Sequence, residues 1–226
     1  MMKQIPYGLT DLARIQKDNY YYVDKTMFIE RIEMQPAYLF LIRPRRFGKS
    51  LTLAMLEAYY DVVYANDFDE LFGHLYIGQH PTPKHNCYLI MRFNFSEVSS
   101  NVNEVERSFK LHCCSKLRDF VFKYEDLLGK EIWDVLDEEI QQDPGAFLSA
   151  INSYASRKGN LPIYLLIDEY DVPLDKAFQY GYYDQMVSLL RVMFGNALKT
   201  NSSLYFAVLT GCLRISKESI FTGTNN

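Results

Sequence analysis

The string RPRRFGKS at residues 43–50 has the residue types of a phosphate-binding loop. Gly48, Lys49 and Ser50 match the second half of the pattern G-x-x-x-x-G-K-[ST], whereas Arg43 replaces its first glycine. Glycine lets the backbone approach an anion closely, and the start of a helix attracts negative charge. We expect Lys49 to reach the β- and γ-phosphates of a nucleotide and the Ser50 hydroxyl to bind Mg²⁺.

The candidate phosphate contacts extend over the whole loop and into the helix that we expect after it. They are Arg45, Arg46, Phe47, Gly48, Lys49, Ser50 and Leu51. The arginines concentrate positive charge in a chain that is acidic overall, although some of them can simply be solvated. The alternative interpretation is a helix N-terminus with a basic turn, because short G-K-S strings are frequent by chance.

A second candidate motif lies downstream, where the apolar run 163–167 ends in two adjacent carboxylates. Asp168 suits support of Mg²⁺, and Glu169 suits a general base that polarises water for attack on a γ-phosphate. The alternative is that strands often end in polar residues. Asp171 has two open interpretations, one as a cap for the next turn and one as a functional group.

The last apolar run ends at Thr210, and Arg214 follows four residues later. Thr210 is a candidate sensor of the γ-phosphate on a strand beside the acidic strand. Arg214 is a candidate for stabilising transition-state charge, from its own or a neighbouring subunit. The alternative is a turn threonine and a surface arginine.

Strands and helices must alternate along the chain to position these groups. Short apolar runs predict strands at 38–42, 87–95, 162–167 and 203–210, the third ending at Asp168. Periodic or helix-length segments predict helices at 27–34, 48–60, 103–122, 144–157 and 182–199. Strands that are apolar on both faces indicate a three-layer α/β fold with a mainly parallel sheet flanked by helices. Its chemistry should lie at the carboxyl ends of the strands.

Composition narrows the class of protein. The chain has 226 residues, 24 Lys and Arg against 28 Asp and Glu, and a formal net charge of -4. A global basic field for nucleic acid is absent, and no apolar run reaches the ~20 residues of a membrane span. The four cysteines form no C-x-x-C pair and the N-terminus lacks signal-peptide order, so we expect a soluble cytoplasmic protein.

Several further groups of residues have a simple structural interpretation beside a functional one. Three histidines and Cys87 within residues 74–87 fit no zinc spacing, and Cys113 and Cys114 suit a packed helix. The tyrosines that follow the phosphate-loop helix could form a partner surface. Residues 178–183 are interpreted as an aromatic loop after the acidic motif, with packing as their favoured role.

Four strings together resemble the bacterial predicted AAA-ATPase-like family. They are YYVDKT at 21–26, RPRRFGKS at 43–50, IDEYD at 167–171 and TGCLRISK at 210–217. The resemblance runs from about Ile5 to the last residue, and in this family an arginine at position 43 is normal. It implies a glutamate-containing P-loop ATPase near the archaeal ATPases and STAND proteins, with ATP and Mg²⁺ as cofactors. It also implies an adenine recess near residues 22–25.

The expected function is ATP hydrolysis coupled to conformational change, in a single P-loop NTPase domain spanning residues 1–226. Many relatives carry a further C-terminal domain that resembles PD-(D/E)XK nucleases, and nothing in this chain corresponds to it. We therefore interpret the chain as the ATPase core of a longer architecture. The alternative function is a nucleotide-gated switch or scaffold with little turnover that regulates a nuclease-like partner domain. A homo-oligomer or a partner protein is expected, and a nucleic-acid-binding effector is not supported.

Overall fold

The computed structural model describes residues 3–98, 103–159, 162–199 and 204–212. Within them, four strands form one sheet: β1 (Tyr38–Ile42), β2 (Leu89–Asn94), β3 (Ile163–Asp168) and β4 (Leu204–Gly211). All three pairings are parallel, and the spatial order is β1-β4-β3-β2. The last strand in the chain therefore lies between the first and the third.

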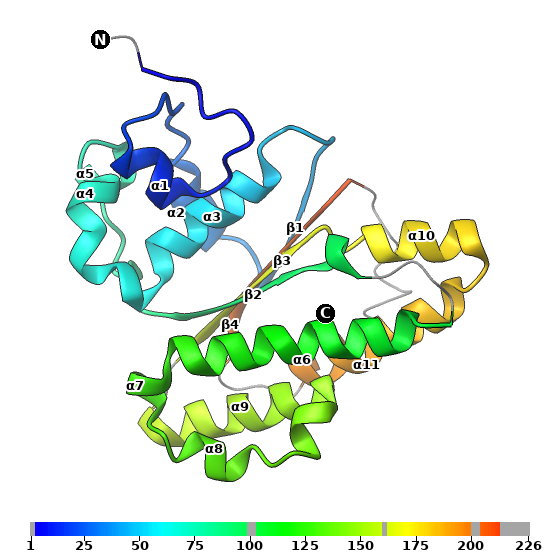
Figure 1. Ribbon diagram of the computed structural model, residues 1–226. Coiled ribbons are helices and arrows are strands. Elements are labelled where there is room, and N and C mark those ends of the chain that lie inside the picture. Colours follow the sequence, from blue (N-terminus) through cyan, green and yellow to red (C-terminus); the bar gives the residue numbers. More distant parts are fainter. Residues whose placement is uncertain (1–2, 99–102, 160–161, 200–203, 213–226) are drawn as a thin grey trace.

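Helices connect and cover these strands (Figure 1). The α-helices before β2 are α1 (Leu12–Lys17), α2 (Phe28–Glu33), α3 (Lys49–Tyr60), α4 (Phe68–Phe72) and α5 (Tyr76–Gln79). Those after it are α6 (Val105–Lys123), α7 (Glu125–Leu128), α8 (Ile132–Val135), α9 (Pro144–Gly159), α10 (Val172–Tyr180) and α11 (Tyr183–Lys199). Three 3₁₀ helices are η1 (Val62–Asp67), η2 (Phe95–Glu97) and η3 (Ile140–Gln142).

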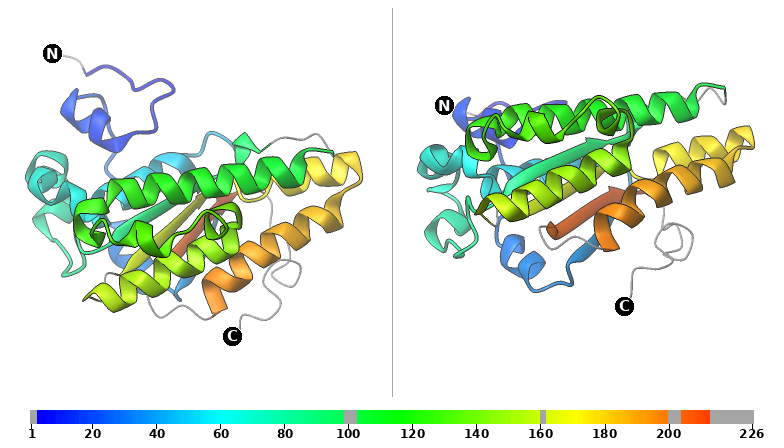
Figure 2. Two further views of the ribbon diagram at one scale, coloured as in Figure 1. Left: turned by 60° about the horizontal axis from the view of Figure 1, so that its bottom comes forward. Right: turned by 90° about the horizontal axis from the view of Figure 1, so that it is seen from below.

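The sheet is covered on both faces, which confirms the expected three-layer α/β class. Helices α1 to α5 lie on one side of the sheet, and α6, α9 and α11 lie on the other (Figures 1 and 2). Strand β3 shows why its sequence is continuously apolar. Ile163, Leu165 and Ile167 pack in the core under α6, α9 and α11, whereas Tyr164 and Leu166 pack in the core under α3. Successive strand residues point to opposite faces, so a strand buried on both faces has no polar side.

Helix α3 packs deeply against the sheet, and Ala54, Met55 and Ala58 are buried. Its buried residues also include Leu53, Leu56, Tyr59 and Tyr60. The suggestion of a partner surface at the tyrosines is wrong for Tyr59 and Tyr60, which are 0% and 1% exposed. Their rings contact each other and other aromatic rings of the core at centroid distances of 4.7–5.6 Å, apart from a 6.0 Å contact to Phe68 and a 6.3 Å contact to His85.

The predicted aromatic loop at 178–183 is also wrong. Residues Phe178 to Tyr180 form the last turn of α10, and α11 begins at Tyr183. Gly181, with φ 78°, adopts the left-handed conformation that commonly ends a helix. The sequence pattern does not indicate a helix here because the aromatic residues do not form one apolar stripe. Phe178 and Tyr180 are exposed, whereas Tyr182 is buried.

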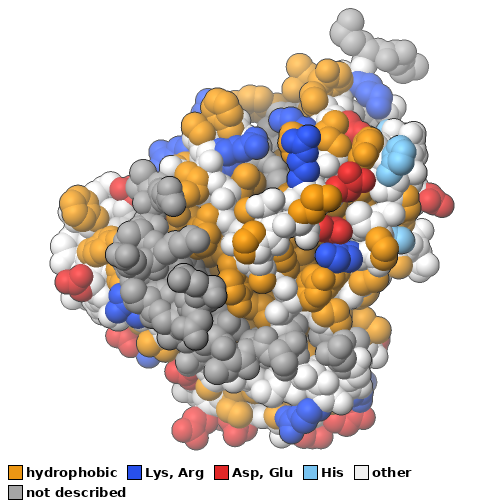
Figure 3. Space-filling model, turned by 180° about the vertical axis from the view of Figure 1, so that it is seen from behind, with side chains coloured by type: hydrophobic (Ala, Val, Ile, Leu, Met, Phe, Trp, Pro, Cys, Tyr) orange, Lys and Arg blue, Asp and Glu red, His pale blue; other side chains and the backbone are white. Residues whose placement is uncertain are grey.

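Figure 3 shows the face behind that of Figure 1. Hydrophobic side chains are exposed over much of it, and Lys and Arg side chains gather along its upper part. Positive charge is therefore locally concentrated in a chain with a net charge of -4. In the part of the chain that the structure describes, no helix combines the length and apolarity needed to cross a bilayer.

Candidate functional site

The loop between β1 and α3 contains two residues in the left-handed backbone region. Gly48, at the N-cap of α3, has φ 75°, and Arg46 has φ 66°. A Cβ atom built on Gly48 would meet nothing within 4 Å, so the backbone angle and not the space favours glycine there. A left-handed arginine is strained, and such strain is concentrated at functional sites.

The side chain of Lys49 folds back into this loop and is only 7% exposed. Its Nζ donates to the carbonyl oxygens of Arg43 at 3.0 Å and Pro44 at 3.1 Å, and to Cys212 Sγ at 3.3 Å. An ammonium group has three donors, so these contacts match its full capacity. The lysine that the sequence assigns to phosphate binding thus lies at the centre of the loop.

The other predicted loop contacts differ in their surroundings. Arg45, Arg46 and Phe47 are exposed, with Phe47 at 62%, whereas Ser50 is half-buried at the start of α3. Leu51 packs against the core on the α3 side of the sheet. Phosphate binding by these residues stays a prediction.

The acidic motif lies at the carboxyl end of β3, as expected. Asp168 is 2% exposed, and its Oδ1 accepts a hydrogen bond from Thr210 Oγ1 at 2.5 Å. Thr210 lies near the end of the neighbouring strand β4 and is fully buried. A backbone hydrogen bond joins the same two segments, since the Tyr170 N–H donates to the Thr210 carbonyl at 3.1 Å. Two predicted site residues, Asp168 and Thr210, are therefore in direct contact.

Glu169 follows directly, half-buried and with φ 54°. A non-glycine residue in this region carries about 1–3 kcal/mol of strain that the surrounding structure must offset. Each of the two candidate motifs thus contains one strained non-glycine residue, Arg46 in the loop and Glu169 after β3.

The structure bears on one of the two interpretations of Asp171, the cap for the next turn, and a functional role for this residue stays a prediction. It occupies the N-cap position of α10, but its side chain makes no capping hydrogen bond there. Instead its Oδ2 accepts the Cys212 N–H at 2.7 Å, and the residue is 4% exposed. A buried carboxylate therefore ties the segment after β3 to the end of β4. No sequence pattern marks Cys212 as a site residue, because a single cysteine after a strand carries no signal of its own.

Adjacent strands bring the two motifs to one edge of the sheet. The Arg43 N–H, at the start of the loop, donates to the Gly211 carbonyl at the end of β4 at 3.1 Å. Strand β4 in turn pairs with β3, which ends at Asp168. Arg214, the remaining candidate of the sequence analysis, lies outside the described residues.

The N-terminal string YYVDKT at residues 21–26 makes hydrogen bonds to α3 and α5. Asp24 accepts hydrogen bonds from the Thr26 N–H and hydroxyl and from the Tyr76 N–H, at 2.7–2.8 Å. Burial disfavours the Asp24 carboxylate, but these hydrogen bonds outweigh it and lower the pKa. Tyr22 contacts Met55 of α3 through its hydroxyl at 3.6 Å. The segment is thereby anchored to α3 and α5.

Of the cysteines, Cys212 contacts the candidate site through the Lys49 ammonium group. Cys113 and Cys114 are buried in the core, which confirms their packing role, and burial raises the pKa of both thiols. Among the described residues, no group of three or more His, Cys, Asp and Glu side chains is placed to hold a metal ion.

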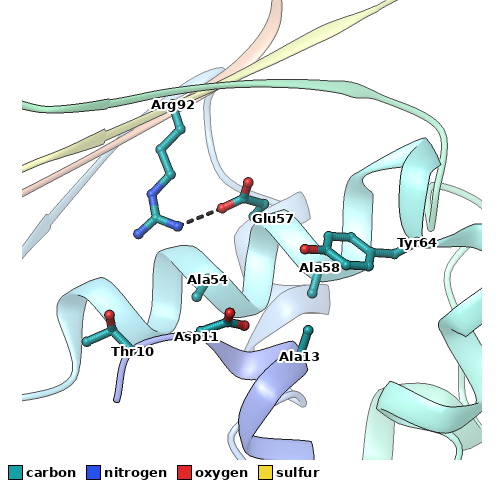
Figure 4. A pocket seen from close by; sticks show the side chains of 8 residues that line it. All are labelled: Thr10, Asp11, Ala13, Ala54, Glu57, Ala58, Tyr64 and Arg92. Atoms are coloured by element: carbon teal, nitrogen blue, oxygen red, sulfur yellow. Dashed lines mark hydrogen bonds and ion pairs between the residues drawn. The ribbon is translucent and has the colours of Figure 1, made fainter. Parts of the chain in front are cut away.

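A polar hollow of about 220 Å³ lies between α1, α3 and β2 (Figure 4). Arg92 of β2 and Glu57 of α3 form an ion pair at 2.6 Å on its wall. The lining residues are Thr10, Asp11, Ala13, Ala54, Glu57, Ala58, Tyr64 and Arg92. None of the predicted nucleotide contacts belongs to this set, so the hollow is distinct from the edge that carries the two motifs.

Comparisons with known proteins place the chain in a family. It is 29% identical over 234 residues to an uncharacterized protein in the vnfD 5′ region of Azotobacter chroococcum mcd 1. That alignment covers 99% of this chain, which spans 40% of the length of the relative. No solved structure matches. A family model described as predicted AAA-ATPase matches residues 6–221. The chain belongs to this predicted AAA-ATPase family.

Proposed function

We propose that residues 1–226 form one P-loop domain that binds ATP with Mg²⁺ and hydrolyses it, with a coupled change of conformation. Membership of a predicted AAA-ATPase family supports nucleotide use in general. The single observation that carries the specific proposal is the meeting of the two motifs at one sheet edge. There β4 lies between β1 and β3, and the contacts of Gly211 and Thr210 join the loop to the acidic strand.

The loop fits a triphosphate. Lys49 supplies a buried ammonium group, and α3, with 12 residues, presents its N-terminus beside Gly48. Backbone amides at such a helix start and the positive end of the helix dipole favour an anion. The exposed side chains of Arg45 and Arg46 can approach the same phosphates from solvent. In this role Lys49 exchanges its contacts with the loop carbonyls for phosphate oxygens.

The donor set also fits magnesium, which prefers oxygen ligands and keeps several waters. Ser50 offers a hydroxyl at the start of α3, and Asp168 offers a carboxylate at the end of β3. Thr210 bonds to Oδ1 of that carboxylate, and a carboxylate has a second oxygen for a cation. Bound Mg²⁺ would neutralise charge on the phosphates.

The hydrolytic step requires a base for water. Glu169 is half-buried directly after Asp168, and its carboxylate would accept a proton from the attacking water. Its left-handed backbone fits a functional constraint, since a relaxed structure has no need for that strain. In this proposal Thr210 senses the γ-phosphate through its bond to Asp168, and Arg214 stabilises transition-state charge from its own or a neighbouring subunit.

Thermal unfolding with nucleotides tests the binding step. At 100 times its Kd, a ligand that binds only the folded state stabilises it by about 2.7 kcal/mol. We expect ATP and ADP with Mg²⁺ to raise the Tm of the wild type and of Lys130→Ala, an exposed control, and GTP to raise it less. Lys49→Ala should lose most of the shift. An equal shift by ATP in Lys49→Ala would refute the phosphate-loop role.

A further inference from the structure

The third contact of the Lys49 ammonium connects segments 163 residues apart in the chain. Two of its acceptors, the carbonyls of Arg43 and Pro44, belong to its own loop. The third, Cys212 Sγ at 3.3 Å, belongs to the end of β4. The position of this sulfur therefore helps to determine where the ammonium group lies.

Cys212 is itself held by the segment that follows the acidic strand. Its N–H donates to the buried Asp171 carboxylate at 2.7 Å. The packing beside this bond is tight, because a Cβ built on Gly211 would lie 2.7 Å from Asp171 Oδ1 and 2.7 Å from Tyr170 Cε1. Only glycine lets the carboxylate and the tyrosine ring come this close to β4. The end of β4 thus has little freedom to shift relative to Asp171.

We propose that Asp171 and Cys212 are positioning residues that hold Lys49 in the phosphate loop. This inference rests on the proposed function, because it concerns the residue expected to bind the triphosphate. The contacts form a chain from Asp171 Oδ2 to the Cys212 N–H, and from Cys212 Sγ to Lys49 Nζ. Asp171 lies two residues after Glu169. Lys49 keeps its contact with Cys212 when it exchanges the two loop carbonyls for phosphate oxygens, so the end of β4, tied to the segment that carries the proposed base, holds the ammonium group toward the phosphates.

The matched variants separate positioning from general stability. Cys212→Ala removes the acceptor of Lys49, Cys212→Ser restores one, and Cys87→Ala changes an exposed thiol whose contacts are to carbonyls of its own segment. Asp171→Ala removes the acceptor of the Cys212 N–H, and Asp171→Asn keeps an oxygen there. The affinities of all variants for ATP and for AMP are measured by calorimetry with Mg²⁺, because Lys49 is expected to contact phosphates that AMP lacks.

Cys212→Ala and Asp171→Ala should weaken ATP binding about threefold to tenfold, as expected for the loss of one hydrogen bond to a weakly accepting sulfur, or of its support. Their AMP affinity should stay at the wild-type value, and Cys212→Ser, Asp171→Asn and Cys87→Ala should bind ATP like the wild type. A general folding defect would instead weaken both nucleotides.

The outcomes distinguish the two proposals. If the wild type binds ATP and Lys49→Ala does not, but Cys212→Ala and Asp171→Ala retain wild-type affinity, the positioning inference is overturned and the proposed function stands. Equal weakening of ATP and AMP binding also overturns the inference. A wild type that does not bind ATP overturns both.

Discussion

The Thr210 hydroxyl donates a hydrogen bond to Asp168 Oδ1 at 2.5 Å, in a position from which solvent is excluded. The two residues are 42 positions apart in the chain and meet because β4 pairs with β3. A buried carboxylate requires such partners, since desolvation penalises an unpaired charge. The bond therefore fixes the direction in which Asp168 presents its oxygens at the sheet edge.

Replacing Thr210 tests the energetic weight of this bond. Thr210→Val keeps the shape but removes the donor, so Asp168 loses its buried partner. We expect a loss of about 1–3 kcal/mol in the free energy of unfolding, measured by urea titration. Thr210→Ser keeps the hydroxyl and should lose much less. A Thr210→Val protein as stable as the wild type would show that the bond contributes nothing to the fold.

Substitutions at the two left-handed residues of the phosphate loop should change the stability of the protein in opposite directions. Gly48→Ala places a side chain at φ 75° and should destabilise the protein by about 1–2 kcal/mol. Arg46→Gly relieves the strain at φ 66° and should raise the stability by up to about 1 kcal/mol, while removing one cation from the loop. Urea titration measures both. If Arg46→Gly destabilised the protein, the claim that Arg46 is strained in the wild type would be wrong.

Burial of His112, on α6, should make the stability of the protein depend on pH. Its side chain is 10% exposed, and burial lowers its pKa below the usual 6.5, helped by Lys116 and opposed by Glu97 and the Asn94 carbonyl. The unfolded chain therefore takes up a proton first as the pH falls below about 6.5, and the folded state loses stability relative to it.

Denaturant titrations between about pH 7 and 5 should show a shallower decline for His112→Gln than for the wild type. His74→Gln, at an exposed position, should follow the wild type. An unchanged slope in His112→Gln would assign the decline to other groups.

An ion pair between an accessible lysine and a buried carboxylate joins the end of α6 to the end of α3. Lys123 Nζ lies 2.6 Å from the carboxylate of Asp61, which is fully buried and also accepts the Tyr124 hydroxyl at 2.9 Å. Burial disfavours the charged lysine, but Asp61 outweighs it and the pKa of Lys123 is raised.

Lys123→Met leaves the buried Asp61 charge without its cation and should reduce the free energy of unfolding by about 1–3 kcal/mol. The control, Lys116→Met on the same helix, breaks a contact of 4.0 Å to the exposed Glu97 and should change it by less than about 1 kcal/mol. Similar losses in both variants would rule out a special role for the pair of Lys123 with Asp61.

The sequence predicts the main elements because their signals are local. All four strands were recognised from short apolar runs, and α3, α6, α9 and α11 from their length and composition. Helix α2 was also predicted, at 27–34, whereas the helices of four or five residues, α4, α5, α7 and α8, were missed because they complete too few turns to show a period. The order β1-β4-β3-β2 was also not predicted, since it depends on long-range pairing.

In the candidate site, too, local features are predictable from the sequence and long-range contacts are not. Asp168 and Thr210 were recognised at strand ends, and the structure brings them into contact. The contact of Lys49 with Cys212 and the bond from Cys212 to Asp171 depend on which strands are neighbours. No local sequence pattern predicts these two contacts, because each joins residues that are far apart in the chain.

Phosphate release by the wild type and by Glu169→Gln tests the central claim most directly. The glutamine keeps the size of the side chain but cannot accept a proton from water. We predict Mg²⁺-dependent phosphate release by the wild type and a loss of about 10²-fold or more in Glu169→Gln, with ATP binding retained. Equal rates in the two proteins would contradict the assignment of Glu169 as the base, and no release by a wild type that binds ATP would contradict hydrolysis itself.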